Sequence, residues 1–167
     1  MQQWLSHSPF FMMVTAAEDA LDCSPRGDRP GQAFRVLDEH TIAIPDRRGN
    51  NRIETLRNLV RDPRIGLLFM IPGIESALRV KGMASISINA KLLESFLTDD
   101  EPAPATVILV NVLSAYVQNA RAIRRAALWD NSTWRSNDQV PDASALSTHG
   151  IVRGHPATDI DRDKLTE

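Results

Sequence analysis

The chain has 167 residues, of which 43% are hydrophobic and 24% are charged, and its formal net charge is −2. This length is enough to bury the core of one globular domain, and the nearly neutral charge excludes a general nucleic-acid binder. The apolar run at residues 9–17 is too short to cross a bilayer, and no basic segment precedes it. We therefore expect a cytoplasmic protein with no membrane partner.

The residue types that form disulfides or bind metals are few and scattered. Cys23 is the only cysteine, which excludes an internal disulfide, and we expect it to be a buried structural thiol. The four histidines show no metal-ligand spacing, so the sequence predicts no metal site.

Apolar and β-branched runs predict a series of short strands. We expect these strands at residues 9–17, 21–24, 33–36, 41–44, 64–71, 77–88 and 105–112. Two segments that contain proline, glycine or clustered charge, 25–31 and 99–104, are predicted to be loops.

Three helices are expected between and after these strands. The first follows Asn51 and ends before Pro63, because proline disfavours helical geometry in the residue before it. Asn89 is a suitable N-cap for the second helix, which carries apolar residues on one side. Ser114 is predicted to cap the third, which would run to about Trp129.

The order of elements indicates the fold class. Short strands with single interposed helices do not match a doubly wound sheet, and no Gly-x-Gly-x-x-Gly follows the first strand. The sequence therefore predicts a mainly β protein, with a small antiparallel barrel and peripheral helices over residues 1–130. Residues 131–167 are polar and form a separate tail, either loosely ordered or packed on a partner subunit.

A polar turn follows the strand expected at residues 41–44. It reads Asp-Arg-Arg-Gly-Asn-Asn-Arg over residues 46–52 and runs directly into a helical pattern formed by Ile53, Leu56, Leu59 and Val60. Backbone N–H groups at a helix start point toward an anion, and forked guanidinium donors match phosphate oxygens. The turn is therefore predicted to bind a phosphate. The alternative is a well-capped helix start with solvated surface arginines.

Several motifs occur in a fixed order along the chain. They are Ser-Pro-Arg-Gly-Asp at 24–28, Ile-Pro-Asp at 44–46, Gly-Asn-Asn-Arg at 49–52, Arg-Asn-Leu at 57–59, Gly-Leu-Leu-Phe at 66–69, Pro-Gly at 72–73 and Leu-Arg-Val at 78–80. Together they resemble the pyridoxamine 5′-phosphate oxidase-like FMN-binding family, in particular a bacterial, largely uncharacterised branch of it. The resemblance covers roughly residues 8–130. It implies a split β-barrel that forms a homodimer, with two FMN sites at the subunit interface.

The resemblance also implies roles for residues of the turn. By position, Arg52 resembles the basic residue that holds the FMN phosphate at the start of the helix. Arg48, Asn50 and Asn51 would complete this cradle, and Asp46 would lie where the end of the preceding strand runs beside the isoalloxazine ring.

Further cofactor-binding candidates lie outside the turn. Arg26 is at the position where oxidase-type members carry a lysine near the flavin or substrate, and Ser24 belongs to the same motif. The alternative for Arg26 is a surface ion pair with Asp28, which would contribute little. Arg79 resembles a position near the cofactor and the dimer interface.

The chain departs from the family pattern in two places. Ala77 stands where close relatives carry a hydroxyl residue, so one polar contact to the flavin is missing. In the last predicted helix, Gln-Asn at 118–119 and Arg121 replace the His-Cys and Lys of this branch, which suggests a different substrate.

Other candidates in the last predicted helix are less specific. Arg121, Arg124 and Arg125 share one helical face. They are candidates for a substrate-anion site or a dimer interface, and the alternative is a solvated basic face near a helix C-terminus. Trp129 is also a candidate substrate or interface residue.

The function that these observations favour is that of a homodimeric, FMN-dependent oxidoreductase acting on an unidentified small molecule. FMN would carry the electron chemistry, and no side chain is assigned as catalytic. Oxidation of an amine with oxygen and reduction of a small substrate both remain open. A pyridoxamine phosphate oxidase proper is disfavoured, because its substrate-phosphate residues are not identifiable near the C-terminus.

Three alternatives remain. The first is a non-catalytic FMN carrier or redox sensor. The second is a split barrel with a changed ligand, heme or a deazaflavin, although no axial histidine is apparent in the expected core. The third is a dimeric scaffold with a vestigial pocket.

Overall fold

The computed structural model describes residues 2–18, 20–29, 31–47, 53–119 and 121–140. The chain divides into two compact units, Met1–Trp129 and Asp130–Glu167. No helix among the described residues is long and apolar enough to span a membrane.

The first unit consists mainly of strands. Its described elements are α1 (Gln2–Leu5), β1 (Phe10–Ala16), β2 (Leu21–Gly27), β3 (Arg35–Val36), β4 (Thr41–Pro45), α2 (Glu54–Arg61), β5 (Arg64–Met70), β6 (Ser76–Ser87), α3 (Ala90–Glu94), β7 (Val107–Asn119) and α4 (Arg121–Arg125). In the second unit, the described residues form two 3-10 turns, η1 (Asn131–Thr133) and η2 (Asn137–Gln139).

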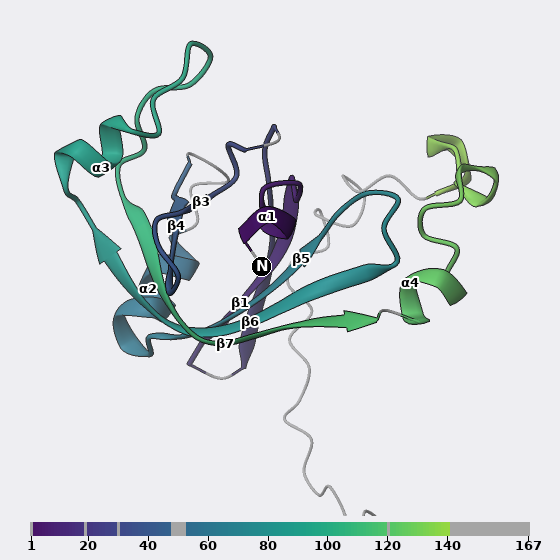
Figure 1. Cartoon of the computed structure of the whole chain (residues 1–167), viewed down its shortest axis with the longest axis horizontal. Helices are drawn as coiled ribbons and strands as arrows, with labels where there is room; N and C mark the ends of the chain where they lie inside the picture. The colour runs from purple at the N-terminus through teal and green to yellow at the C-terminus, as the bar shows by residue number, and fades with distance from the viewer. Residues whose placement is uncertain (1, 19, 30, 48–52, 120, 141–167) are drawn as a thin grey trace, which may run out of the picture. The chain divides into compact units, whose positions relative to one another are not determined.

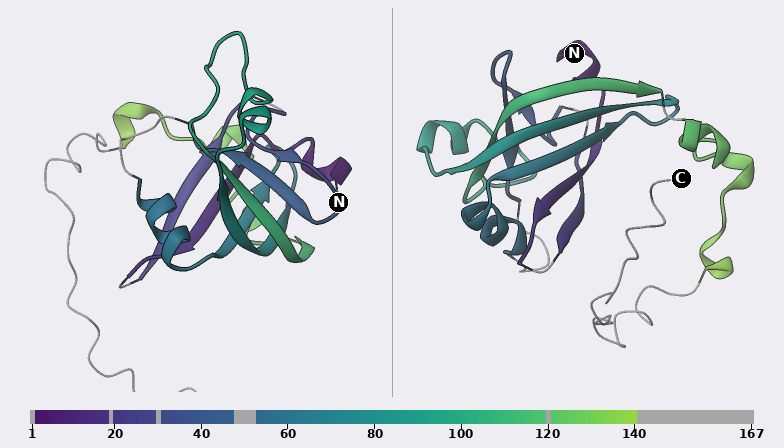
Figure 2. Two further views of the ribbon diagram at one scale, coloured as in Figure 1. Left: turned by 90° about the vertical axis from the view of Figure 1, so that its left-hand side faces the viewer. Right: turned by 90° about the horizontal axis from the view of Figure 1, so that it is seen from below.

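The seven strands form one antiparallel sheet in the order β2-β1-β5-β6-β7-β4-β3. β6 and β7 are the longest strands and lie side by side, with α3 near one end and α4 near the other (Figure 1). The sheet is strongly twisted and curled, as the two further views show (Figure 2). The mainly β, antiparallel architecture predicted from the sequence is confirmed.

The core lies on the inner face of the curled sheet. In β1 the buried positions alternate with partly exposed ones, as expected for a strand with one face in the core. Phe11, Phe34 and Phe69 are its largest aromatic contacts, with ring centroids 5.8, 4.9 and 4.8 Å apart for the three pairs. Each ring stabilises the fold by about 1.5–3 kcal/mol through burial alone. The core thus rigidly supports the strands that carry the candidate site.

β2 is longer than the sequence predicts. The segment 25–31 was expected to be a loop, but Pro25, Arg26 and Gly27 continue the strand and pair with β1 up to Phe10. Proline is tolerated here because β2 is an edge strand of the sheet, where one row of N–H groups needs no partner. The extension is important because it places Arg26 on a strand rather than on a loop.

The helix predicted to begin at Ser114 is wrong. Residues 114–119 belong to β7 and pair with β6 as far as Ser76, and the helix is limited to α4. Near the middle of this ladder, Lys81 pairs with Ser114 and Gly82 with Val112, so Leu113 is the extra residue of a β-bulge. By contrast, the predicted N-cap of α3 is confirmed, because the Asn89 side chain accepts a hydrogen bond from the N–H of Leu92 at 3.2 Å.

Candidate functional site

Three elements bring polar side chains together at one place. Ser24 and Arg26 lie two residues apart on β2, Asp46 follows β4 directly, and Thr55 lies in the first turn of α2. The Arg26 Nη2 atom donates to Thr55 Oγ1 at 3.1 Å, and Nη1 lies 3.6 Å from Asp46 Oδ1. The side chains of Arg26 and Asp46 are only 24% and 25% exposed. This cluster contains Ser24, Arg26 and Asp46 of the predicted site residues.

Two atoms of this cluster lack hydrogen-bond partners among the described residues. The Ser24 hydroxyl oxygen and the Arg26 Nε atom are both buried and make no hydrogen bond to any described residue. A buried donor that remains unpaired is unfavourable by about 1–3 kcal/mol, so native proteins seldom leave one without a partner. The chemistry of the two groups suits an oxygen-rich anionic ligand, such as the phosphate and ribityl chain of FMN.

The carboxyl group of Asp46 titrates in an unusual environment. Burial raises its pKa above the ordinary value, and the positive charge of Arg26 opposes this shift. The effect of burial is the larger one, so Asp46 holds its proton more strongly than a free aspartate would.

The start of α2 differs from the sequence-based expectation. The sequence predicted a helical pattern that begins with Ile53 and ends with Val60, but these two apolar residues are 51% and 76% exposed. The buried face consists of Thr55, Asn58 and Leu59, and the Asn58 Nδ2 atom donates to Thr15 Oγ1 on β1 at 3.1 Å. Within the part of the chain that the structure describes, no side chain caps the helix at Ile53. Thr55 was not among the predicted site residues, because its role depends on its partner Arg26 on β2.

Several predicted site residues cannot be placed in this cluster. Arg48, Asn50, Asn51 and Arg52 lie outside the described residues. Arg79 is exposed on β6, where it is paired in register with Leu68 and Tyr116. Its neighbour Leu78 shares the buried face with Arg26, so Arg79 projects from the other face of the sheet, three strands away from β2.

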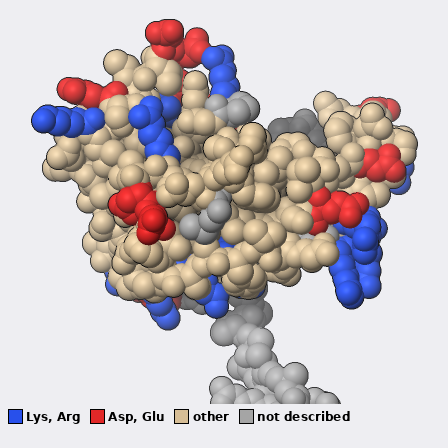
Figure 3. Space-filling model, viewed as in Figure 1, with Lys and Arg blue, Asp and Glu red and all other residues tan. Residues whose placement is uncertain are grey.

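The weaker candidates lie at the far ends of β6 and β7. Arg121 and Arg124 are exposed on α4, and Arg124 Nη1 lies 3.9 Å from Glu75 Oε2. Charged side chains gather near α4 and near α3, with a mostly uncharged surface between them (Figure 3). Trp129 Nε1 donates to the carbonyl of Ile74 at 3.0 Å, which attaches it to the turn before β6.

Two further expectations concern residues outside the cluster. Cys23 is exposed, so the expectation of a buried thiol is wrong; the cause is that β2 turns its odd-numbered residues outward. Ala77, which the family resemblance singled out as a departure, is 4% exposed and paired with Met70 and Gln118. No group of His, Cys, Asp or Glu in the described segments has the arrangement of a metal site.

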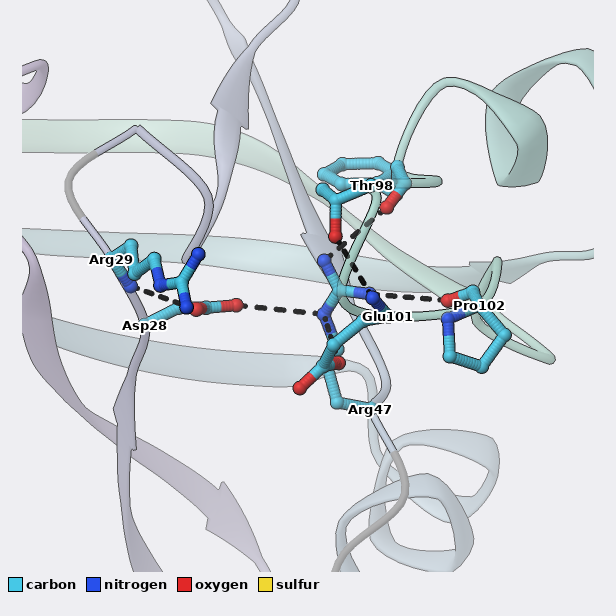
Figure 4. Close-up of polar contacts among 7 residues, drawn as sticks. Asp28, Arg29, Arg47, Thr98, Glu101 and Pro102 are labelled. Atoms are coloured by element: carbon cyan, nitrogen blue, oxygen red, sulfur yellow. Dashed lines mark hydrogen bonds and ion pairs between the residues drawn. The ribbon is translucent and has the colours of Figure 1, made fainter.

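The Arg47 side chain is not available to bind a phosphate in this structure, although Arg47 belongs to the turn that the sequence predicted to do so. Its guanidinium group is surrounded by Asp28, Glu101 and Pro102, which come from two separate loops (Figure 4). Its donors are therefore directed at the protein itself.

Comparison with known proteins identifies the family. The sequence model of the pyridoxamine 5′-phosphate oxidase family matches residues 1–127. The chain belongs to this family. The comparison with curated proteins finds no match.

Solved structures share the fold of this family member. HupZ from Group A Streptococcus has a TM-score of 0.58 at 15% identity, and the matched region covers 72% of this chain and 92% of the HupZ chain. General stress protein 26 from Bacillus anthracis has a TM-score of 0.55 at 15% identity, with coverages of 72% and 92%. A proposed pyridoxamine 5′-phosphate oxidase from Lactobacillus delbrueckii has a TM-score of 0.54 at 19% identity, with coverages of 69% and 89%. At these identities the similarity shows the fold alone, and it agrees with the predicted split barrel.

Proposed function

We propose that this protein binds FMN at the junction of β2, β4 and α2 and acts as an FMN-dependent oxidoreductase on a small molecule. The observation that carries the proposal is a pair of buried groups on β2 that have no hydrogen-bond partner among the described residues, the Ser24 hydroxyl and the Arg26 Nε atom. They lie on the strand whose Arg26 reaches the first turn of α2. A helix start favours an anion through its free N–H groups, and among the described residues no side chain caps this one.

The residues of the chain would divide the work of binding. Thr55 and Asp46 hold the Arg26 guanidinium in place, so that its charge is already oriented when the cofactor arrives. The Ser24 hydroxyl can donate to a cofactor oxygen. Arg48, Asn50, Asn51 and Arg52, assigned through the family resemblance, would complete the phosphate cradle. When bound, FMN supplies the electron-transfer chemistry.

A second candidate is a non-catalytic FMN carrier or redox sensor. It is favoured by the composition of the described cluster, in which Asp46 is the only group that could transfer a proton. The two candidates differ in turnover. An enzyme would oxidise or reduce many molecules of a defined substrate per bound FMN, whereas a carrier would bind FMN without multiple turnover.

We also propose that the protein functions as a homodimer through the outer face of the sheet. Met12 on β1 and Leu68 on β5 are paired in register and are only partly buried. Partly exposed apolar side chains on neighbouring strands are typical of a surface that a second subunit covers. Sedimentation should show a dimer that Leu68→Glu converts to a monomer, whereas Arg61→Ala, an exposed change on α2, should leave it intact. A monomeric wild-type protein that binds FMN tightly would contradict this proposal.

The flavin assignment is tested by purifying the protein, releasing any bound chromophore with heat and identifying it. Released FMN, or stoichiometric uptake of added FMN, would support the proposal. Released heme or a deazaflavin would instead support a changed ligand. Anaerobic reduction followed by exposure to oxygen or to candidate acceptors would then separate an oxidoreductase from a carrier.

A further inference from the structure

Asp46 and Arg47 are adjacent in sequence but connect the end of β4 to different parts of the chain. Asp46 forms an ion pair with Arg26 on β2. Arg47 contacts the loop after β2 and the segment between α3 and β7. The last residue of β4 is therefore followed by two consecutive residues whose side chains attach it to other segments.

Each nitrogen of the Arg47 guanidinium faces an oxygen of the protein. Nη1 donates to the carbonyl of Pro102 at 3.2 Å, and Nη2 donates to the carbonyl of Phe96 at 3.3 Å. Nε is buried and makes no hydrogen bond of good geometry, but it lies 3.2 Å from Glu101 Oε2 and 3.5 Å from Asp28 Oδ2 as an ion pair (Figure 4). A planar guanidinium that meets four groups at once fixes their relative positions.

The surroundings of Arg47 differ from those of its neighbour Arg29. The Arg47 side chain is only 18% exposed, and Phe96 belongs to a buried cluster with Ala43 of β4. Arg29 pairs with Asp100 and so links the same two loops, but these side chains are 68% and 61% exposed. Exposed pairs of this kind contribute little, whereas a partly buried arginine with carbonyl and carboxylate partners restrains the backbone.

This restraint acts where the strand ladder ends. Pro45 pairs with Val107, and the N–H of Asp46 donates to the carbonyl of Thr106 at 3.0 Å. Arg47 is the next residue. Backbone pairing with β7 stops before it, and its side chain instead attaches the chain to the segment between α3 and β7. The position of Asp46 relative to Arg26 depends on this last attachment.

We infer that Arg47 is a positioning residue for the proposed FMN site. It holds the end of β4 so that Asp46 meets Arg26 and Arg26 remains directed at Thr55. Arg47 itself does not contact the cofactor. The inference rests on the proposed FMN binding for its functional consequence, but not for its structural one.

The first test compares the FMN affinity of the wild type, Arg47→Ala, Arg47→Lys and the control Arg29→Ala by fluorescence titration well below the melting temperature of each protein. We expect Arg47→Ala to weaken binding at least about tenfold, as loss of a charge-assisted network would. Arg47→Lys keeps the positive charge but loses the planar set of donors of the guanidinium group. Compared with Arg47→Ala, it should therefore restore more of the thermal stability than of the FMN affinity. Arg29→Ala should match the wild type. Equal affinity in all four proteins would overturn the inference.

The second test needs no cofactor and also covers the case in which Arg47→Ala does not fold. Hydrogen exchange of the Asp46 amide, which donates to Thr106, is measured in the wild type, Arg47→Lys and Arg29→Ala. Exchange should be faster in Arg47→Lys alone; unchanged exchange would refute the positioning role. If the wild type binds no FMN but this exchange result holds, the proposed function fails while the positioning of Asp46 by Arg47 stands.

Discussion

Arg26 on β2 and Thr55 on α2 are joined by a hydrogen bond of 3.1 Å from Nη2 to Oγ1. β2 is an edge strand, so this bond attaches the edge of the sheet to the helix start at which we place the phosphate. The same guanidinium group has a buried Nε atom that has no partner among the described residues. One side chain therefore connects two elements and has a donor that we propose is available to the cofactor.

Replacing Arg26 by alanine should weaken FMN binding about ten- to a hundredfold, because a hydrogen bond to a charged group contributes about 1.5–3 kcal/mol. Fluorescence titration of the purified apoprotein measures this change. The matched control is Arg61→Ala, since Arg61 lies on α2 but is 63% exposed and pairs with Glu18. Equal, small effects at Arg26 and Arg61 would show that β2 does not contribute to the cofactor site.

The hydrogen bond between Asn58 and Thr15 should contribute to stability. It is buried and connects α2 to β1, so Asn58→Ala leaves a buried hydroxyl without its donor and should lower the free energy of unfolding by about 1–3 kcal/mol. Urea unfolding of Asn58→Ala, Thr15→Val and the double variant measures the coupling. We expect the double variant to lose less than the sum of the single ones. Strict additivity would contradict a direct bond, and the exposed Arg57→Ala serves as control.

The raised pKa of Asp46 predicts a specific pH dependence of stability. Because burial raises this pKa, the folded protein keeps the proton at pH values at which the unfolded chain has released it. The contribution to the free energy of unfolding is complete below the ordinary value of 3.8 and falls as the pH rises through the raised value. Asp46→Asn should remove this fall.

The measurement is urea unfolding of the wild type and Asp46→Asn across the acidic range. Asp62 has the opposite behaviour, since its hydrogen bond with Arg64 lowers its pKa to about 2; its stabilising contribution is complete above the ordinary value of 3.8 and is lost as the pH falls toward 2. This slope is common to both proteins, so it cancels in their difference. A difference that does not vary with pH would refute the assignment to Asp46.

The β-bulge makes a sharp prediction for glycine. A Cβ at Gly82 would lie 2.5 Å from the carbonyl oxygen of Asn111, whereas a Cβ at Gly66 would meet only Val14 at 3.8 Å. Gly82→Ala should therefore destabilise the fold by about 1–3 kcal/mol through overpacking against backbone, while Gly66→Ala should be tolerated. Thermal unfolding compares the two variants. Equal melting temperatures would mean that the two strands separate easily at the bulge.

Much of the fold follows from sequence periodicity, and the errors have physical causes. The third helix was predicted because Val117, Ala120, Ile123 and Ala127 follow one another at helical spacing in the sequence. Pairing with β6 instead satisfies the backbone of residues 114–119 as a strand. The bulge at Leu113 also shifts the alternation of inward and outward residues, which conceals a strand pattern. Local spacing cannot report a partner strand that lies more than thirty residues earlier, as Ser76 does for Asn119.

The polar cluster at β2, β4 and α2 contains some of the residues that the sequence proposed for cofactor binding. Ser24, Arg26 and Asp46 were found through motifs, and the structure brings Arg26 and Asp46 together. Thr55 was not found, because a threonine in an amphipathic helix shows its role only when its partner on β2 is known. Arg47 was grouped with phosphate ligands because composition reveals charge but not which carbonyl groups surround it.

The most direct test of the central claim is titration of the heat-stripped protein with FMN, followed by flavin absorbance and fluorescence, in the wild type and in Arg26→Ala. We expect saturable binding with one FMN per chain in the wild type and strongly weakened binding in the variant. A wild-type protein that is colourless as purified and takes up no FMN would contradict the flavin site at β2, β4 and α2.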